Sequence, residues 1–505
     1  MKLPAKRVLF LLHRWVGIVL GIFCVLWFCS GIVMMYVGYP KLTEVERLQH
    51  LPVLDSTIPM LAPATALQRA GVFGPLRELR LAQASGARPV YLAQPASVNN
   101  TVQTTMPAVI VIDAQSGMRL PPVDAAHAVA SAQTYAGRHI ELQYLDQVQE
   151  DAFTHTRSLD RHRPLHRVLL DDVDRTLLYI SGQTGEVVRD AARSERCWNY
   201  VGAWIHWLYP LRGNVFQPYW SFLLDSLAIA CSVAGISGAW IGILRWRWRQ
   251  RYRNGNTSPY QNGAMRWHHL GGLSFALIVV TWSFSGLMSM NPWHIFNSGR
   301  APLQQQALRG DGLYLTESDA APALLLRIAG AKIRELRWQR VVGQTIVLAQ
   351  AETDAPVILD SASAYQMALN QDQLLEAARS LLLSPVRAVT WQTEYDFYYY
   401  NRDAHSLYGD RIKPLPIVRL EYDDAYRSWV YLDPHTGQVI SELDRRQRFS
   451  RWLFSMLHSW DWLPLLENRP AWDILLITLS LGGLLTGVTG CIIGARRLNL
   501  TLRKR

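Results

Sequence analysis

The stretch HRWVGIVLGIFCVLWFCSGIVMM, residues 13–35, is the strongest structural signal in this chain. After its first three residues it is almost wholly apolar, and about 20 such residues cross the hydrocarbon core of a bilayer as a helix. Residues 268–290, HHLGGLSFALIVVTWSFSGLMSM, follow the same pattern 255 residues later. This shift superimposes six pairs of residues: His13 on His268, Gly17 on Gly272, Trp27 on Trp282, Ser30 on Ser285, Gly31 on Gly286 and Met35 on Met290. The pattern predicts two copies of one membrane helix, and hence an internally duplicated chain.

A second apolar segment is also present twice. A shift of 252 residues superimposes His206 on His458, Pro218 on Pro470, Trp220 on Trp472, Gly235 on Gly487, Gly238 on Gly490 and Gly242 on Gly494. A third histidine pair, His155 and His405, is separated by 250 residues. With 14 His in 505 residues, three pairs at nearly one interval are improbable by chance. We interpret the chain as two tandem copies, each with two membrane spans.

Positive charge is concentrated in three segments. Residues 1–15, 245–266 and 495–505 hold 15 Lys and Arg and no Asp or Glu. Short cytoplasmic segments carry such an excess, so we expect both termini and the middle loop to be cytoplasmic. Each copy then forms a parallel repeat about an axis along the membrane normal, and equivalent residues lie at equal depth. The net charge of +11 reflects this topology. We exclude nucleic-acid binding, because the basic residues alternate with Trp and Tyr as at a membrane interface.

The long segments between the spans contain strand-like runs bounded by turn signals, such as residues 108–117 and 429–439. We expect small α+β units there, two in each half. The predicted fold class is a membrane α+β protein, with four transmembrane helices in two tandem parallel repeats and two periplasmic α+β regions. The expected segments are helix 1 in 1–37, periplasmic region 1 in 38–196, an interfacial helix and helix 2 in 197–244, a cytoplasmic loop in 245–266, helix 3 in 267–290, periplasmic region 2 in 291–448, an interfacial helix and helix 4 in 449–494, and a cytoplasmic tail in 495–505.

Four short motifs carry a family resemblance. They are HRWVG at 13–17, RCWNYVGAWIHW at 196–207, WHH at 267–269 and the hairpin YLDPHTG at 431–437. With these motifs the sequence resembles the PepSY-associated transmembrane family over nearly its whole length. The resemblance implies PepSY-like periplasmic regions and a place in the bacterial inner membrane. It also implies kinship with reductases of siderophore-bound ferric iron that carry two b-type haems.

The paired histidines point to the same chemistry. Two neutral imidazoles on opposite sides of an iron porphyrin bind its metal. An ionisable side chain at membrane depth is costly and marks a functional site. We predict one haem b near the cytoplasm, held by His13 and His268, and a second near the periplasm, held by His206 and His458. His269 is the alternative ligand at the inner site.

Two further residue pairs have less certain roles. His155 and His405 lie in the external regions, where a further haem, a metal, the substrate iron or a structural hydrogen bond would each account for them. Trp27 and Trp282 lie between the two depths of the paired histidines. They would carry electrons between the sites or pack in the bundle, and packing is favoured.

The sequence contains no GxGxxG, Walker, nucleophile-elbow or HExxH motif in the context its chemistry requires. The expected cytoplasmic segments are too short to form a flavin or nicotinamide domain. We therefore expect a transmembrane, haem-dependent oxidoreductase that takes electrons from a cytoplasmic flavin, a reductase or membrane quinol. Its acceptor would be a periplasmic ferric siderophore or another periplasmic molecule, and its spans would contact membrane lipid. The alternatives are a PepSY-type periplasmic binding or regulatory protein, and a transporter of iron or haem.

Overall fold

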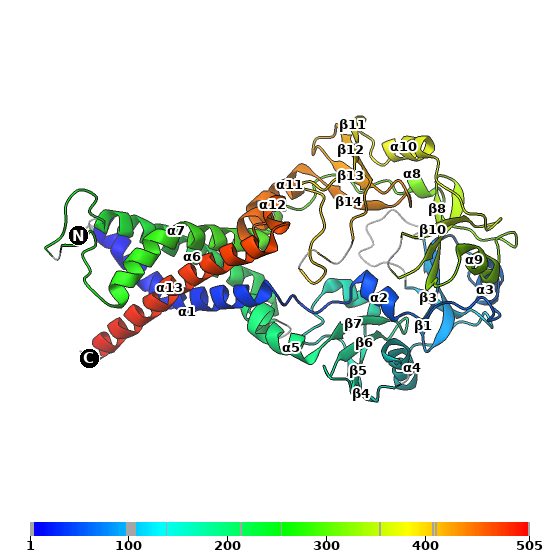
Figure 1. The fold of residues 1–505 in the computed structure, drawn as a ribbon, viewed down its shortest axis with the longest axis horizontal. Coiled ribbons are helices and arrows are strands. Elements are labelled where there is room, and N and C mark those ends of the chain that lie inside the picture. Colours follow the sequence, from blue (N-terminus) through cyan, green and yellow to red (C-terminus); the bar gives the residue numbers. More distant parts are fainter. Residues whose placement is uncertain are drawn as a thin grey trace.

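The computed structural model describes residues 5–96, 108–137, 139–212, 215–253, 255–352, 355–406, 409 and 412–502. A bundle of long helices forms one end of the molecule, and a head built on three β-sheets forms the other (Figure 1). The bundle helices are α1 (Ala5–Met34), α6 (Trp220–Arg245), α7 (Ala264–Ser289) and α13 (Arg469–Leu502). All four are long and apolar enough to cross a membrane. With the sheets, they confirm the predicted membrane α+β class.

Helix α13 extends further than the sequence analysis expected. It runs to Leu502, so most of the segment expected as a tail continues the helix. After Gly494 this segment contains neither Gly nor Pro, and nothing therefore interrupts the main-chain hydrogen bonds.

Helices α1 and α7 occupy opposite corners of the bundle, because each packs against both α6 and α13. Glycines on α6 and α13 bring the helices close together. A Cβ atom on Gly235 would lie 2.8 Å from a methyl group of Val280, and one on Gly487 would lie 3.0 Å from Val25. Small residues are the usual means of close helix approach in membranes. The packing therefore places facing residues of α1 and α7 across the bundle axis.

The head contains one six-stranded and two four-stranded antiparallel sheets, with strand orders β10-β9-β8-β1-β2-β3, β4-β5-β6-β7 and β11-β12-β13-β14. The strands of the first sheet are β1 (Leu76–Ser85), β2 (Arg88–Pro95), β3 (Ile110–Asp113), β8 (Glu335–Val341), β9 (Gln344–Gln350) and β10 (Val357–Asp360). Those of the others are β4 (Leu142–Val148), β5 (Leu165–Leu170), β6 (Leu177–Ser181), β7 (Val187–Ala191), β11 (Val386–Gln392), β12 (Ile417–Tyr422), β13 (Trp429–Leu432) and β14 (Val439–Leu443).

Shorter helices cover the sheets and join the head to the bundle. They are α2 (Glu44–His50), α3 (Pro63–Arg69), α4 (Ala125–Ala136), α5 (Arg193–Asn199), α8 (Gln306–Arg309), α9 (Pro322–Ala329), α10 (Gln371–Arg379), α11 (Arg445–Arg451) and α12 (Leu463–Leu466).

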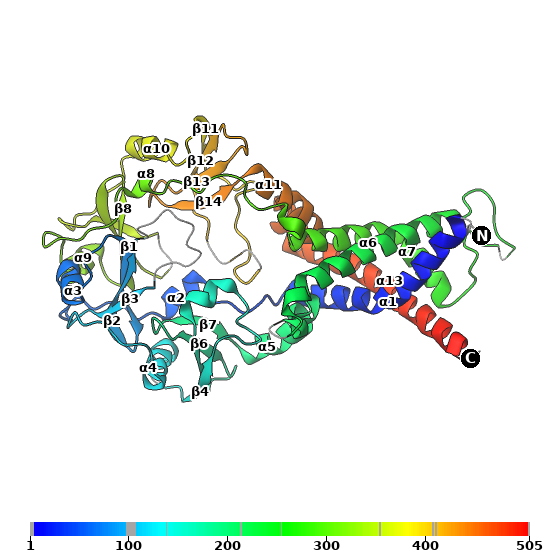
Figure 2. The ribbon, with the colours of Figure 1, turned by 180° about the vertical axis from the view of Figure 1, so that it is seen from behind.

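The six-stranded sheet joins strands from both halves of the chain, where the sequence analysis expected separate α+β units. Strand β1 pairs with β8, with Leu79 opposite Trp338 and Arg80 opposite Arg337. The two strands lie side by side in the view from behind (Figure 2). Each half contributes three strands to this sheet, β1–β3 from the first half and β8–β10 from the second. Because β1 and β8 pair with each other, neither is an open sheet edge, and open edges are prone to unwanted pairing.

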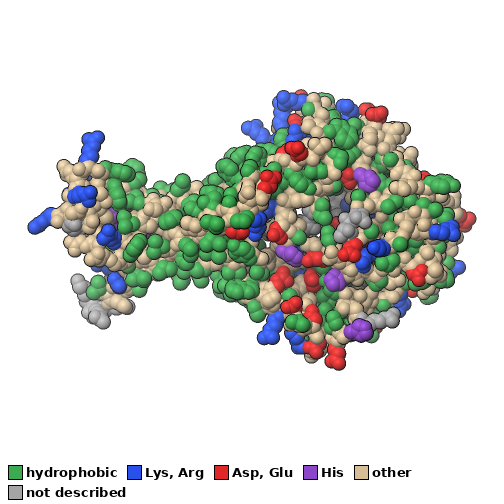
Figure 3. All heavy atoms as spheres, in the orientation of Figure 1, with side chains coloured by type: hydrophobic (Ala, Val, Ile, Leu, Met, Phe, Trp, Pro, Cys, Tyr) green, Lys and Arg blue, Asp and Glu red, His purple; other side chains and the backbone are tan. Residues whose placement is uncertain are grey.

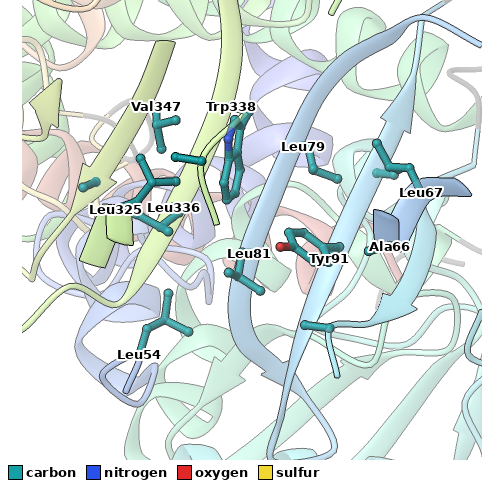
Figure 4. Close-up of a cluster of buried hydrophobic side chains, with 14 of the residues drawn as sticks. Leu54, Ala66, Leu67, Leu79, Leu81, Tyr91, Leu325, Leu336, Trp338 and Val347 are labelled. Atoms are coloured by element: carbon teal, nitrogen blue, oxygen red, sulfur yellow. The ribbon is translucent and has the colours of Figure 1, made fainter. Parts of the chain in front are cut away.

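The main core of the head lies at this junction. Leu79 and Leu81 of β1, Tyr91 of β2, and Leu336 and Trp338 of β8 are all fully buried and belong to one cluster (Figure 4). Because this core combines side chains from both halves, it fixes their relative position.

Candidate functional site

Two pairs of histidines face each other in the helix bundle. The ring centres of His13 on α1 and His268 on α7 lie 6.2 Å apart, with 37° between the ring planes. The ring centres of His206 and His458, which follow short irregular helices at the head end of the bundle, lie 6.1 Å apart with 76° between the planes. The structure thus brings together both pairs that the sequence repeat predicts.

We call His206 and His458, at the head end of the bundle, the outer pair, and His13 and His268 the inner pair. At the outer pair, each Nδ1 atom contacts a serine hydroxyl. His206 Nδ1 lies 3.0 Å from Ser30 Oγ, and His458 Nδ1 lies 3.0 Å from Ser285 Oγ. Each serine also donates to the carbonyl of the residue three positions earlier, Trp27 or Trp282, at 3.2 Å. Each imidazole therefore docks through Nδ1 onto one turn of a membrane helix.

The inner pair docks in the same way, on the other two helices. His13 Nδ1 lies 3.0 Å from the Ala234 carbonyl and 3.5 Å from Ser237 Oγ, both on α6. His268 Nδ1 lies 3.1 Å from the Thr486 carbonyl and 3.2 Å from Thr489 Oγ1, both on α13. Within the described part of the chain, no hydrogen bond reaches Nε2 of any of the four histidines.

A glycine follows each of these hydroxyl residues, and an imidazole lies over it. A Cβ atom on Gly238 would stand 2.5 Å from His13 Cε1, and one on Gly490 would stand 3.3 Å from His268 Cε1. The corresponding distances are 3.8 Å from Gly31 to His206 and 3.6 Å from Gly286 to His458. Each histidine thus sits in a socket, which we define as a helix carbonyl, the Ser or Thr three residues later, and the glycine after it.

The main chain before each outer histidine has an unusual conformation. A short π-helix precedes each one, at Tyr200–Trp204 and at Trp452–Met456. Single π-helical turns often occur at functional sites. Shortly after the histidines, Leu208 and Trp460 have backbone φ angles of 50° and 51°, which residues other than glycine seldom adopt. The same device in both halves turns the chain so that the two imidazoles face each other.

The outer pair lines a cavity of about 510 Å³ between the bundle and the head. Its wall includes Trp27 and Trp282, and Arg402 and Arg469 also line it. A cavity of this size, with mostly apolar walls and a few polar groups, is typical of a small-molecule or cofactor site.

Burial of the outer histidines favours their neutral form. Burial, with a smaller contribution from the neighbouring imidazole, lowers the pKa of His206 to about 3. Burial also lowers the pKa of His458 to about 4. A neutral imidazole whose Nδ1 atom carries the proton has a lone pair on Nε2, which is the form that binds a metal.

His269 is placed differently from its neighbour. Its Nδ1 atom lies 2.7 Å from Ser258 Oγ and its Nε2 atom lies 3.1 Å from the Gly242 carbonyl. Both ring nitrogens therefore already have protein partners, and the ring is buried. The structure offers His268 for ligation and leaves His269 without an available nitrogen.

His155 and His405 each contact a carboxylate in a different part of the head. His155 is buried, and its Nδ1 atom contacts Glu150. His405 Nε2 lies 2.9 Å from Glu46, and this contact raises the pKa of His405. Among the described residues, no group of three or more His, Cys, Asp and Glu has the geometry to hold a metal ion. His155 therefore has a structural hydrogen bond, while His405 also lines the cavity beside His206 and His458. The roles of both residues stay predictions.

Trp27 and Trp282 are at the outer cavity, as the repeat implies, but their contacts differ. The Trp27 indole donates to the His206 carbonyl at 2.9 Å, which fixes the backbone of that histidine. The Trp282 ring packs 5.6 Å from the ring of Phe28, and its buried N–H group has no hydrogen-bond partner in the described residues. Both side chains pack, and they also line the space beside the histidines.

The hydroxyl residues of the sockets were not among the site residues predicted from the sequence. Their signal is the Ser-Gly or Thr-Gly dipeptide that ends at Gly31, Gly238, Gly286 and Gly490, each on a predicted span. Ser30, Gly31 and their equivalents mark the repeat, but a dipeptide alone does not reveal which side chain docks on it.

Comparison with known proteins agrees with this architecture. A family model described as the PepSY-associated TM region matches residues 10–392. The match begins just before His13 and includes helices α1, α6 and α7. No curated protein matches the chain.

Proposed function

Because the chain belongs to the family of PepSY-associated transmembrane proteins, we propose that it is a haem-dependent oxidoreductase that moves electrons across a membrane. His13 and His268 would hold one haem b, and His206 and His458 would hold a second. The bound haems would supply one-electron redox chemistry at two depths of the bilayer.

The separation of the facing imidazoles is the observation that carries this proposal. A metal held between two imidazoles requires about 6 Å between the ring centres, since each metal–nitrogen bond is about 2 Å and each nitrogen lies about 1 Å from its ring centre. The observed distances are 6.2 and 6.1 Å. Packed rings also occur at about 4.5–7 Å, so the spacing supports ligation together with the sockets, which hold Nδ1 of all four imidazoles.

The protein contributes orientation, tautomer and surroundings. Each socket holds the Nδ1 proton, so Nε2 of each ring is left for the metal. Such outer hydrogen bonds fix the ring orientation and raise the basicity of a ligand. At the outer site, the cavity wall is mostly apolar, and Arg402 and Arg469 would suit the carboxylates of a haem.

We propose that the two halves form a tandem parallel repeat, with the head in the periplasm and both termini in the cytoplasm of a bacterium. The repeated sockets support the first point, because Ala234 and Thr486, like Ser30 and Ser285, are equivalent under the sequence shifts. The reductant would come from outside the polypeptide, as a soluble flavin, a partner reductase or membrane quinol.

The acceptor would be a periplasmic ferric complex, with a siderophore as the leading candidate. Ferric iron in such a complex is held by hard oxygen ligands, and addition of one electron weakens their hold. The released ferrous ion would be the product. The outer cavity faces the head, which is the side from which such an acceptor would approach.

The absorption spectrum of the purified protein tests the proposal. We expect b-type Soret and α bands that change on reduction with dithionite, and a pyridine haemochrome assay should give two haems per chain. A colourless preparation would favour a periplasmic binding or regulatory protein and remove the oxidoreductase.

Variants at the histidines assign the ligands. His206→Ala and His268→Ala should each lose about half the haem, because each removes one ligand of one site. His269→Ala is the matched control, since it changes the residue beside His268, whose two ring nitrogens already have partners, and it should retain both haems.

A further inference from the structure

Each of the four paired imidazoles contacts one hydroxyl group: Ser30, Ser285, Ser237 or Thr489. We propose that these four residues are positioning residues that hold the Nδ1 protons, and that the two outer serines also set the reduction potential of the outer group. This inference rests on the proposed function, because it concerns how the same histidines would hold haem.

The direction of the outer hydrogen bonds follows from the helix. Ser30 donates its own proton to the Trp27 carbonyl, and Ser285 donates to the Trp282 carbonyl. Each serine oxygen is therefore left as an acceptor, and the imidazole must donate from Nδ1. Both serines are fully buried, so water does not replace them if they are removed.

The inner and outer sockets differ in which acceptor is nearer. At the outer pair the hydroxyl oxygens lie 3.0 Å from Nδ1. At the inner pair the main-chain carbonyls lie at 3.0 and 3.1 Å, and the hydroxyls are farther away, at 3.5 and 3.2 Å. A side-chain substitution removes the nearest acceptor only at the outer pair, because the nearest acceptors of the inner pair belong to the backbone. The Trp27 and Trp282 carbonyls also face the outer imidazoles, so loss of a serine hydroxyl weakens the contact at Nδ1 without removing every acceptor.

This difference has a redox consequence. A hydrogen bond donated from Nδ1 makes the imidazole a stronger electron donor to iron, and second-shell hydrogen bonding is one of the means by which proteins adjust haem potential. A stronger donor stabilises ferric iron relative to ferrous iron. Loss of the serine hydroxyls should therefore raise the potential of the outer group and leave that of the inner group unchanged.

A potentiometric titration followed by absorption spectroscopy tests this inference on the full-length protein. In the double variant Ser30→Ala and Ser285→Ala, we expect one of the two redox transitions to move to higher potential while the other stays in place. Ser232→Ala is the matched control, since Ser232 is also on α6 and its hydroxyl donates to the Ala228 carbonyl at 2.9 Å, away from the sockets. We expect both transitions of that variant to match those of the unaltered protein.

The double variant Ser30→Thr and Ser285→Thr provides a rescue. Threonine keeps the hydroxyl, bonds to the preceding helix carbonyls, and already serves in the socket at Thr489. We expect wild-type potentials from this variant. If the alanine variant loses the outer haem altogether, restoration by threonine still supports positioning by the hydroxyl, and failure of threonine to restore it overturns the inference.

The outcomes separate this inference from the proposed function. Two bound haems with unchanged potentials in the double alanine variant would refute the role of the serines and leave the oxidoreductase intact. Equal shifts of both transitions would also refute it, because the effect would then not be local. An unaltered protein without haem would overturn the proposed function itself.

Discussion

The facing imidazoles differ in the angle between their planes, which is 37° for His13 and His268 and 76° for His206 and His458. In low-spin ferric haem, nearly perpendicular axial imidazoles give a larger maximum g value than nearly parallel ones, since the ligand planes set the splitting of the iron d orbitals. We expect two distinct low-spin signals in the electron paramagnetic resonance spectrum. His206→Ala should remove the signal with the larger g value, and a single signal from the unaltered protein would contradict the two geometries.

The glycines of the sockets should differ in their tolerance of a methyl group. A Cβ atom on Gly238 would lie 2.5 Å from His13 Cε1, which is shorter than any normal contact. Gly238→Ala should therefore displace His13, and the haem content should fall by about half because the inner site loses one ligand. Gly17 lies on the same helix as His13 with nothing within 4 Å of a new Cβ atom, so Gly17→Ala is the control. Equal haem content in both variants would argue against the socket.

The identity of the paired histidines was predictable from the sequence, but their orientation was not. A repeat reveals which residues are equivalent, and it favoured His268 over His269. The structure gives both ring nitrogens of His269 hydrogen-bond partners and leaves Nε2 of His268 available, but which residue binds haem stays a prediction. The partners that orient the paired rings lie far along the chain: the Ala234 and Thr486 carbonyls are separated from His13 and His268 by 221 and 218 residues. Hydrogen bonds across such separations depend on helix packing, which the sequence pattern does not specify.

At the scale of elements, the strand-like runs were predictable and their pairing across the halves was not. The repeated motif LRELR at 76–80 lies in β1, and its counterpart IRELR at 333–337 ends in the first residues of β8. The two strands pair antiparallel, with Arg80 opposite Arg337. A sequence repeat shows that two strands are alike. It does not show that they share one sheet, because pairing depends on which edges the rest of the fold leaves open.

This junction also contains a buried charge network. Glu335 on β8 is fully buried and lies 2.9 Å from Arg47, 3.2 Å from Arg80 and 2.8 Å from Arg337. Glu335→Gln removes the anion and leaves these cations without their shared partner, which should cost about 3–5 kcal/mol of unfolding free energy. Glu78→Gln is the control, because that carboxylate is partly exposed and 4.0 Å from Arg80. Thermal unfolding followed by circular dichroism should show a large fall in midpoint for the first variant and almost none for the second.

The same carboxylate gives the stability of the head a dependence on pH. Burial alone would raise the pKa of Glu335, but Arg47, Arg337 and Arg80 outweigh it and hold the pKa well below its usual value. The stabilisation is therefore complete above the pKa of an unfolded glutamate, about 4.3, and is lost as the pH falls further towards the folded value. The difference in unfolding midpoint between the unaltered protein and Glu335→Gln should be constant near neutral pH and shrink in acid. A difference that grew on acidification would contradict this sign.

At the scale of the whole molecule, charge and apolar surface are separated along the long axis. Lys and Arg side chains gather at the end of the bundle far from the head, a hydrophobic surface covers the middle of the bundle, and both signs of charge occur on the head (Figure 3). Such a distribution is what the positive-inside rule describes for a protein whose bundle end is cytoplasmic. The membrane character was predictable because it depends on composition over about 20 residues, which needs no knowledge of tertiary contacts.

The protein's own cysteines allow its orientation in the membrane to be tested. Cys197 on α5 is exposed on the head side, whereas Cys24, Cys29, Cys231 and Cys491 all lie on the spanning helices. A membrane-impermeant maleimide added to spheroplasts should therefore label the protein at Cys197, and Cys197→Ser should abolish the labelling. Combining Cys197→Ser with Arg249→Cys moves the only aqueous thiol to the exposed loop after α6, and this variant should be labelled only after the membrane is permeabilised. The reverse pattern would place the head in the cytoplasm, and the outer haem would then stand on the wrong side of the membrane to reduce a periplasmic acceptor.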